Sequence, residues 1–192
     1  MASMLDQLVL LRHGETEWSV ARRHTGRTDV QLTEQGRAEA THIGGALARF
    51  DIAAAFASPL SRALETARLA GLDPHIDDDL VEWDYGVYEG ITTADIRTSI
   101  PGWSVWTHPI PHGESLADVA VRVDRVIERV TAIDGTVVLI AHAHLLRVLG
   151  ARWLELDALE GRRLALDTAT LSILGWEREN RVVHRWNDPF VG

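Results

Sequence analysis

Short apolar runs that stop abruptly at polar residues are the feature that most restricts the fold of this chain. Leu8 to Leu11, Ile52 to Ala57 and Thr136 to Ala141 are mostly apolar stretches of strand length, a pattern typical of strands buried on both faces of a parallel sheet. Each is followed by a segment of helical periodicity. This alternation predicts an α/β fold, a three-layer sandwich in which helices flank a mostly parallel central sheet.

Start and stop signals set the remaining boundaries. The predicted helices follow Thr33 up to Leu47, open at Ser58-Pro59 and run through Leu69, follow Ser115 up to Val130, and extend from about Leu145 to Leu156. Alternating apolar residues from Leu171 to Trp176 and from Val182 to Trp186 predict a closing pair of strands.

Composition limits the class of protein. The 192 residues suffice for one core but are few for two domains, so we expect a single domain over 1–192. A net charge of -9 argues against nucleic-acid binding, which needs a basic surface. The absence of cysteine excludes thiol chemistry. With neither a leader pattern at Met1 to Gln7 nor a long apolar run, we expect a cytoplasmic protein without membrane contact.

Polar residues with chemical potential follow three of the predicted strands. They are Arg12-His13-Gly14, Ser58 with Arg62 beyond it, and His142-Ala143-His144. Open parallel sheets bind ligands at the carboxyl ends of their strands, so these groups are expected to meet. An arginine fork suits phosphate oxygens, a neutral imidazole can attack phosphorus, and Gly14 would allow backbone to approach a ligand. Taken alone, an Arg-His pair is more often structural.

Several motifs in order extend this pattern over nearly the whole chain. They are Leu11-Arg12-His13-Gly14-Glu15-Thr16, Thr25-Gly26 with Asp29 and Leu32-Thr33, Ser58-Pro59 with Arg62 and Thr66-Ala67, Glu82 with Gly86 and Glu89-Gly90, Gly113-Glu114-Ser115, and His142-Ala143-His144. In this ordered set the chain resembles the histidine phosphatase superfamily, which includes the cofactor-dependent phosphoglycerate mutases.

The resemblance implies a role for each matching residue. His13 would be the nucleophile, and Arg12, Arg62 and His142 would hold the phosphoryl group. Glu82 would give a proton to the leaving oxygen, with Trp83 and Tyr85 making its surroundings less aqueous and Asp84 as the rival acid.

The phosphate-binding set implied by the resemblance contains two departures from the commonest pattern. It comprises Arg12, Ser19, Thr25, Gly26, Arg62, His142 and Ala143. Ser19 stands where many members have asparagine, and we expect its hydroxyl to donate to phosphate. Ala143 replaces a glycine and can offer its N–H if the backbone there does not need a positive φ.

The predicted function is a metal-independent and cofactor-free phosphatase of small phosphorylated metabolites, with sugar phosphates as the leading class, of the histidine acid phosphatase type. The alternatives are a phosphoglycerate mutase, for which the chain is short, and a phosphoester-binding protein without turnover. His142 and His144 could project together as metal ligands, but no further ligand motif accompanies them. A small-molecule phosphoester is the expected partner, and a homodimer is left open.

The segment at about 91–113 is expected to cover the substrate. Trp103 and Trp106 within it either select the organic part of the substrate or form a small satellite core with Trp18 and Trp83. His144 is interpreted as a helix-start or supporting residue. The ordinary surface or capping histidines are taken to be His24, His42, His75 and His184.

Overall fold

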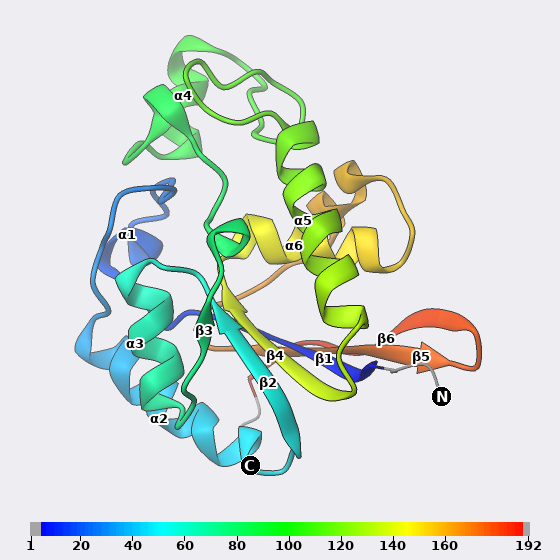
Figure 1. The fold of residues 1–192 in the computed structure, drawn as a ribbon. Coiled ribbons are helices and arrows are strands. Elements are labelled where there is room, and N and C mark those ends of the chain that lie inside the picture. Colours follow the sequence, from blue (N-terminus) through cyan, green and yellow to red (C-terminus); the bar gives the residue numbers. More distant parts are fainter. Residues whose placement is uncertain (1–4, 190–192) are drawn as a thin grey trace.

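A computed structural model describes residues 5–189 as one six-stranded sheet between two layers of helices (Figure 1). The strands are β1 (Leu5–Arg12), β2 (Ile52–Ala57), β3 (His75–Ile76), β4 (Gly135–Ala141), β5 (Leu171–Glu177) and β6 (Asn180–Asp188). Their order across the sheet is β3-β2-β4-β1-β5-β6. The first four are mutually parallel, whereas β5 pairs antiparallel with β1 and with β6. The predicted mostly parallel α/β architecture is confirmed.

The helices are divided between the two faces of the sheet. They are α1 (Glu17–Val20), α2 (Glu34–Leu47), α3 (Ser61–Leu69), α4 (Thr93–Ser99), α5 (Leu116–Thr131) and α6 (Ala143–Trp153), with single 3-10 turns at Asp78–Leu80 (η1), Gly86–Tyr88 (η2) and Ala158–Arg163 (η3). None of these helices is long and apolar enough to cross a membrane.

Alternating side chains of the central strands form two separate cores. Leu8 and Leu10 of β1 join the core beneath α5 and α6, whereas Val9 and Leu11 join the core beneath α2 and α3. This is the period of two that a strand requires when both of its faces are covered. The continuous apolar run at the start of the chain is explained by these two cores.

Two predicted helix starts shift in the structure. Ser58 and Pro59 lie before α3 instead of opening it, and Leu60 occupies the N-cap without a side-chain hydrogen bond. The Ser58 hydroxyl instead lies 2.8 Å from His142 Nε2. α6 begins at Ala143, earlier than the predicted Leu145, directly after the N-cap His142.

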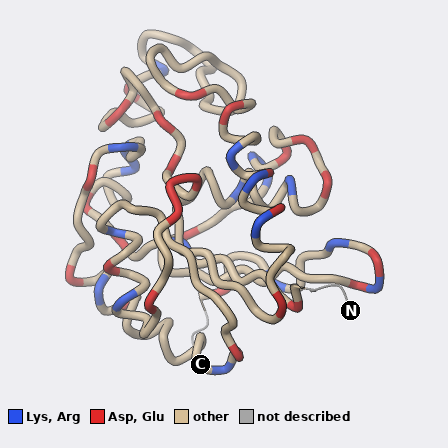
Figure 2. The backbone as a smooth tube through the Cα atoms, in the orientation of Figure 1, with Lys and Arg blue, Asp and Glu red and all other residues tan. Residues whose placement is uncertain are grey.

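Charged residues are mixed over the whole fold. Figure 2 shows positions of basic residues interspersed with acidic ones along the chain, without a single continuous basic stripe. Any strong anion site in this acidic protein must therefore be local.

Candidate active site

His13 follows β1 and lies at the carboxyl edge of the sheet. Its N–H donates to the Ala141 carbonyl over 3.0 Å, which ties the end of β1 to the end of β4. The ring is buried, and Nδ1 lies 2.8 Å from the Gly14 carbonyl oxygen. Because a carbonyl can only accept, Nδ1 carries the proton and Nε2 keeps its lone pair. The ring is thus oriented as a nitrogen nucleophile.

The electrostatic surroundings keep this imidazole neutral. Burial lowers the pKa of His13 well below 6.5, and the neighbouring positive charges of Arg62 and Arg12 lower it further. A neutral ring can attack phosphorus without first losing a proton.

A cavity of about 370 Å³ opens beside His13 and is lined mostly by polar residues. Its lining residues are Arg12, His13, Thr16, Ser19, Arg22, Arg23, His24, Thr25, Glu82, Tyr85, Thr93, Ala143, His144, Arg147, Leu166 and Asp167. The cavity therefore combines a nucleophile, several cations and many hydroxyl or ring groups.

Arg12 is the cation best placed in this cavity to meet an anion. One of its terminal nitrogens, Nη1, donates to the Leu166 carbonyl over 2.6 Å, which anchors the guanidinium. Its Nε is buried without a hydrogen-bond partner among the described residues. The second terminal nitrogen, Nη2, has no partner among the described residues and is not among their buried unsatisfied atoms, so this nitrogen is available to an anion in the cavity.

Arg62 and His142 lie behind the nucleophile and do not line the cavity. Both side chains are fully buried, and the His142 ring centre is 5.1 Å from that of His13. Arg62 Nε donates to His142 Nδ1 over 3.2 Å, so the other ring nitrogen of His142 carries the proton and donates to Ser58. The Arg62 terminal nitrogens donate to the carbonyls of Thr25, Gly26 and Thr28. Direct phosphate contact by this pair stays a prediction, because four protein acceptors use the Arg62 donors.

Glu82 reaches the cavity as a fixed and buried carboxylate. Its Oε1 accepts the N–H groups of Trp83 and Leu145, both over 2.9 Å, and its Oε2 accepts the N–H of His144 over 3.0 Å. The side chain is therefore held against the first turn of α6. The rival acid Asp84 lies outside the cavity lining and accepts the Gly86 N–H instead.

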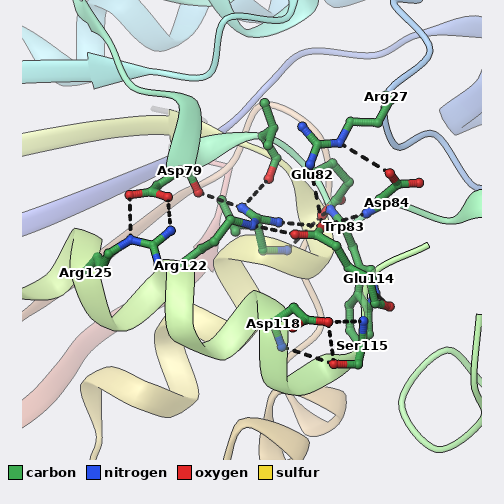
Figure 3. Close-up of polar contacts among 12 residues, drawn as sticks. Arg27, Asp79, Glu82, Trp83, Asp84, Glu114, Ser115, Asp118, Arg122 and Arg125 are labelled. Atoms are coloured by element: carbon green, nitrogen blue, oxygen red, sulfur yellow. Dashed lines mark hydrogen bonds and ion pairs between the residues drawn. The ribbon is translucent and has the colours of Figure 1, made fainter. Parts of the chain in front are cut away.

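The ion pair between Arg122 and Glu114 holds the residues on both sides of Glu82 in place (Figure 3). Arg122 Nε lies 2.8 Å from Glu114 Oε1, and Arg122 Nη1 donates to the Val81 carbonyl over 3.0 Å. Glu114 accepts the Asp84 N–H through Oε2 and the indole N–H of Trp83 through its carbonyl. The Gly-Glu-Ser motif at 113–115 thus acts on the acid loop and does not contact the cavity.

Replacing Arg122 with methionine is expected to destabilise the fold and to lower kcat. The change leaves the mostly buried Glu114 carboxylate with only the half-exposed Arg27, 3.9 Å away, as a cationic partner. Removing one partner of a buried pair costs about 3–5 kcal/mol. Urea unfolding measures the loss. The double variant Arg122→Met/Glu114→Met should recover part of it, and equal losses in the single and double variants would contradict this account.

The other residues of the predicted phosphate-binding set differ in whether they line the cavity. Ala143 has no positive φ, and at the start of α6 its N–H has no protein acceptor among the described residues, so the glycine is not needed there. Ser19 lines the cavity, but its hydroxyl donates to the Thr16 carbonyl in the capping box of α1. Thr25 also lines the cavity and donates to Arg23. Gly26 does not line it, and its carbonyl supports Arg62.

Gly14 has a packing role in the structure. A Cβ at this position would overlap the Gly36 backbone, and a Cβ at Gly36 would overlap the backbone of Glu15. The glycine is therefore required for packing the nucleophile loop against the start of α2. Its predicted part in ligand approach stays a prediction. The Gly14 N–H donates to the buried hydroxyl of Thr66 over 3.0 Å.

The two tryptophans of segment 91–113 lie behind the cavity wall. Trp103 is 1% exposed and belongs to the main core with Trp83, and Trp106 packs against that core. Of the two expectations, packing in a core agrees better with the structure than lining the pocket. The core is, however, the main one and not a small satellite, and it does not include Trp18. From the 91–113 segment, the cavity lining includes Thr93. Whether the segment covers a substrate stays a prediction.

His24 corrects the expectation of an ordinary surface histidine. It is 8% exposed and lines the cavity, whereas His42, His75 and His184 are exposed as expected. No sequence signal separated His24 from the others, because its burial depends on the distant α4 and on the aromatic core. His144 also lines the cavity. The described residues contain no cluster of three or more potential metal ligands.

The buried histidines make stability fall with acidification. Burial lowers the pKa of His24 to about 4 and lowers those of His13, His142 and His144 well below 6.5. Above pH 6.5 both folded and unfolded chains hold these rings neutral. As pH falls below 6.5 the unfolded chain binds protons that the folded chain excludes, so the free energy of unfolding decreases.

We expect His24→Phe to flatten this dependence. The His24 contribution amounts to about 1.4 kcal/mol per pH unit while pH lies between the unfolded pKa and the folded value near 4. Urea unfolding at several pH values from 7 to 5 measures the slope. Identical slopes for wild type and His24→Phe would refute the prediction.

The chain is similar to a known family along almost its full length. The model of the histidine phosphatase superfamily (branch 1) matches residues 8–189. The chain belongs to the histidine phosphatase superfamily. An acid phosphatase of Mycobacterium tuberculosis is 44% identical over 178 residues, covering 89% of this chain and 87% of that protein.

The chain is also similar to phosphatases with lower sequence identity. Sedoheptulose 1,7-bisphosphatase of Saccharomyces cerevisiae is 30% identical, covering 81% of this chain and 70% of that protein. The structure of a mycobacterial glucosyl-3-phosphoglycerate phosphatase in complex with VO3 is 32% identical with a TM-score of 0.85, covering 95% of this chain and 99% of that one. The predicted phosphatase of small phosphorylated metabolites is confirmed at this level.

Proposed function

We propose that this superfamily member hydrolyses phosphate monoesters, sugar phosphates foremost, through a phosphohistidine formed on His13. The observation that carries the proposal is the neutral His13 ring, whose Nδ1 is fixed on the Gly14 carbonyl while Nε2 has no partner within residues 5–189. Arg12 and the N-terminus of α6 supply positive electrostatic potential beside it.

The reaction proceeds in two steps, phosphorylation of His13 and hydrolysis of the phosphohistidine. His13 Nε2 attacks phosphorus, the bond from phosphorus to the ester oxygen breaks, and Glu82 protonates the departing alcohol. Glu82 then takes a proton from water, the resulting hydroxide attacks phosphorus, and the bond to His13 breaks to release inorganic phosphate. Arg12 and the free N–H of Ala143 stabilise the charge on the equatorial oxygens in both steps.

The acid-phosphatase type is supported by the same nucleophile. Because the pKa of His13 lies well below 6.5, the ring stays neutral when the medium becomes acidic. Hydrolysis is favoured over mutase chemistry by the 44% identity to an acid phosphatase along most of both chains.

Rapid mixing with a ³²P-labelled phosphate ester, followed by denaturation in alkali, tests the proposal. Wild type should retain acid-labile label, as a phosphoramidate does, and His13→Ala should retain none. Release of inorganic phosphate should survive EDTA. Absence of both label and phosphate release across a broad panel of esters would leave a binding protein as the better account, and rapid 3-phosphoglycerate isomerisation would favour the mutase.

A further inference from the structure

Two imidazoles line a part of the cavity wall that the proposed mechanism does not use. His24 lies in the loop after α1, and His144 is the second residue of α6. Both line the cavity although they are more than a hundred positions apart in the chain, with ring centres 6.3 Å apart. Their juxtaposition is a product of the fold.

Each ring is held through one nitrogen and leaves the other for a ligand. His24 Nε2 lies 3.1 Å from the Thr93 hydroxyl, and His144 Nδ1 lies 2.7 Å from the Tyr85 hydroxyl. The second nitrogens, His24 Nδ1 and His144 Nε2, have no partner among the described residues. Neither nitrogen is among the buried unsatisfied atoms of the described residues, so both are solvent-accessible. Because both residues line the cavity, a ligand in the cavity can contact these nitrogens.

Aromatic packing fixes the planes of both rings. His24 lies 4.8 Å from Tyr85 and 5.3 Å from Trp103, measured between ring centres. His144 lies 5.3 Å from Trp106. The tryptophans thus act from behind the wall, and the histidines present the polar edge to a substrate.

Both rings are uncharged near neutral pH. Burial lowers the pKa of His24 to about 4, and burial with the charge of Arg147 lowers that of His144. A neutral imidazole offers one donor and one acceptor, and one of them is already used by Thr93 or Tyr85. The free nitrogen suits a hydroxyl group, which accepts or donates as required, better than it suits an anion.

The position of Glu82 places this wall next to the departing alcohol. Glu82 accepts the backbone N–H of His144, so an ester oxygen that takes its proton from Glu82 lies beside that residue. We propose that His24 and His144 bind hydroxyl groups on the alcohol part of the substrate, so that the enzyme selects phosphate esters of polyols, sugar phosphates among them. The inference rests on the proposed phosphatase function and assigns its specificity.

Glycerol 1-phosphate and propyl phosphate form the matched pair that tests it, since both have a three-carbon skeleton and differ in two hydroxyl groups. Wild type should prefer glycerol 1-phosphate by about tenfold or more in kcat/KM, because unpaired polar groups in a site disfavour an analogue that lacks its hydroxyls. His24→Phe, which keeps an aromatic ring against Tyr85 and Trp103, should reduce that preference to about threefold or less. Thr93→Val, which frees the ring without removing it, should give an intermediate ratio.

The control variant is His42→Phe, because His42 is exposed on α2 and outside this cavity. It should keep the wild-type ratio. An unchanged ratio in folded His24→Phe and in Thr93→Val would overturn the inference, as would a wild-type preference for 3-phosphoglycerate over glycerol 1-phosphate that survives both substitutions. Failure to hydrolyse either ester would instead count against the phosphatase function itself.

Discussion

Glu82→Gln is expected to lower the steady-state kcat for an alkyl phosphate by about 10²–10⁴-fold, the usual range for loss of a general acid or base. Glutamine has the same size and keeps one carbonyl oxygen for the N–H groups of Trp83 and Leu145, and it loses only the acceptor of the His144 N–H. It cannot supply the proton that an alkoxide needs. The loss therefore reports on chemistry more than on folding.

A substrate with an activated leaving group separates the two steps. 4-Nitrophenolate departs without protonation, so Glu82→Gln should still phosphorylate His13 and should release about one equivalent of nitrophenolate in a burst. Hydrolysis of the phosphohistidine should then be slow, because no base activates water. Stopped-flow absorbance with acid-labile label counting measures both steps.

Asp84→Asn is the matched control, since Asp84 lies two residues away and outside the cavity lining. We expect it to change kcat by less than about threefold, far below the effect of removing an acid or base. An equal loss in Asp84→Asn and Glu82→Gln, or a Glu82→Gln enzyme without a burst, would argue against Glu82 as the proton carrier.

Arg62→Met is expected to remove most activity and to lower the free energy of unfolding by about 3–5 kcal/mol. The side chain is fully buried and its donors serve three carbonyls in segment 25–28 as well as His142 Nδ1. Those acceptors would be left unsatisfied. Loss of the charge would also remove a cause of the low pKa of His13 and weaken phosphate stabilisation, by about 10²–10³-fold.

Two comparisons test the Arg62 prediction. Arg62→Lys should recover little, because a single ammonium cannot reproduce a fork that reaches four acceptors. Arg37→Met removes a half-exposed partner of Glu65 and should cost less than about 1 kcal/mol. Urea unfolding and kcat/KM on the folded fraction measure the two effects. Full stability in Arg62→Met would show that segment 25–28 does not depend on it.

Long periodic elements were predictable from sequence because their burial pattern is local. Thr33 caps α2 as expected, and Ser115 with Asp118 forms the capping box of α5. The four-residue α1 and the two-residue β3 were not predicted, since neither is long enough to show a period. The antiparallel attachment of β5 and β6 completes a sheet whose parallel part was anticipated.

At the site, sequence predicted which residues gather at the sheet edge but not how they share hydrogen bonds. His13 and Glu82 both line the cavity at that edge. That Arg62 donates to protein carbonyls, or that Ser58 meets His142, depends on contacts across the fold. The burial of His24 likewise depends on distant segments, so a local pattern could not distinguish it from exposed histidines.

The contact between Gly14 and Gly36 affects how a mutational scan of this enzyme would be interpreted. Gly36 lies in the first turn of α2 and outside the cavity. Any side chain there would nevertheless overlap the backbone of Glu15, two residues after the nucleophile. Substitutions at Gly36 would score as severely as substitutions in the site. A map of sensitive positions would thus mark the rear of the nucleophile loop as functional, although its contribution is to leave space for a main-chain contact.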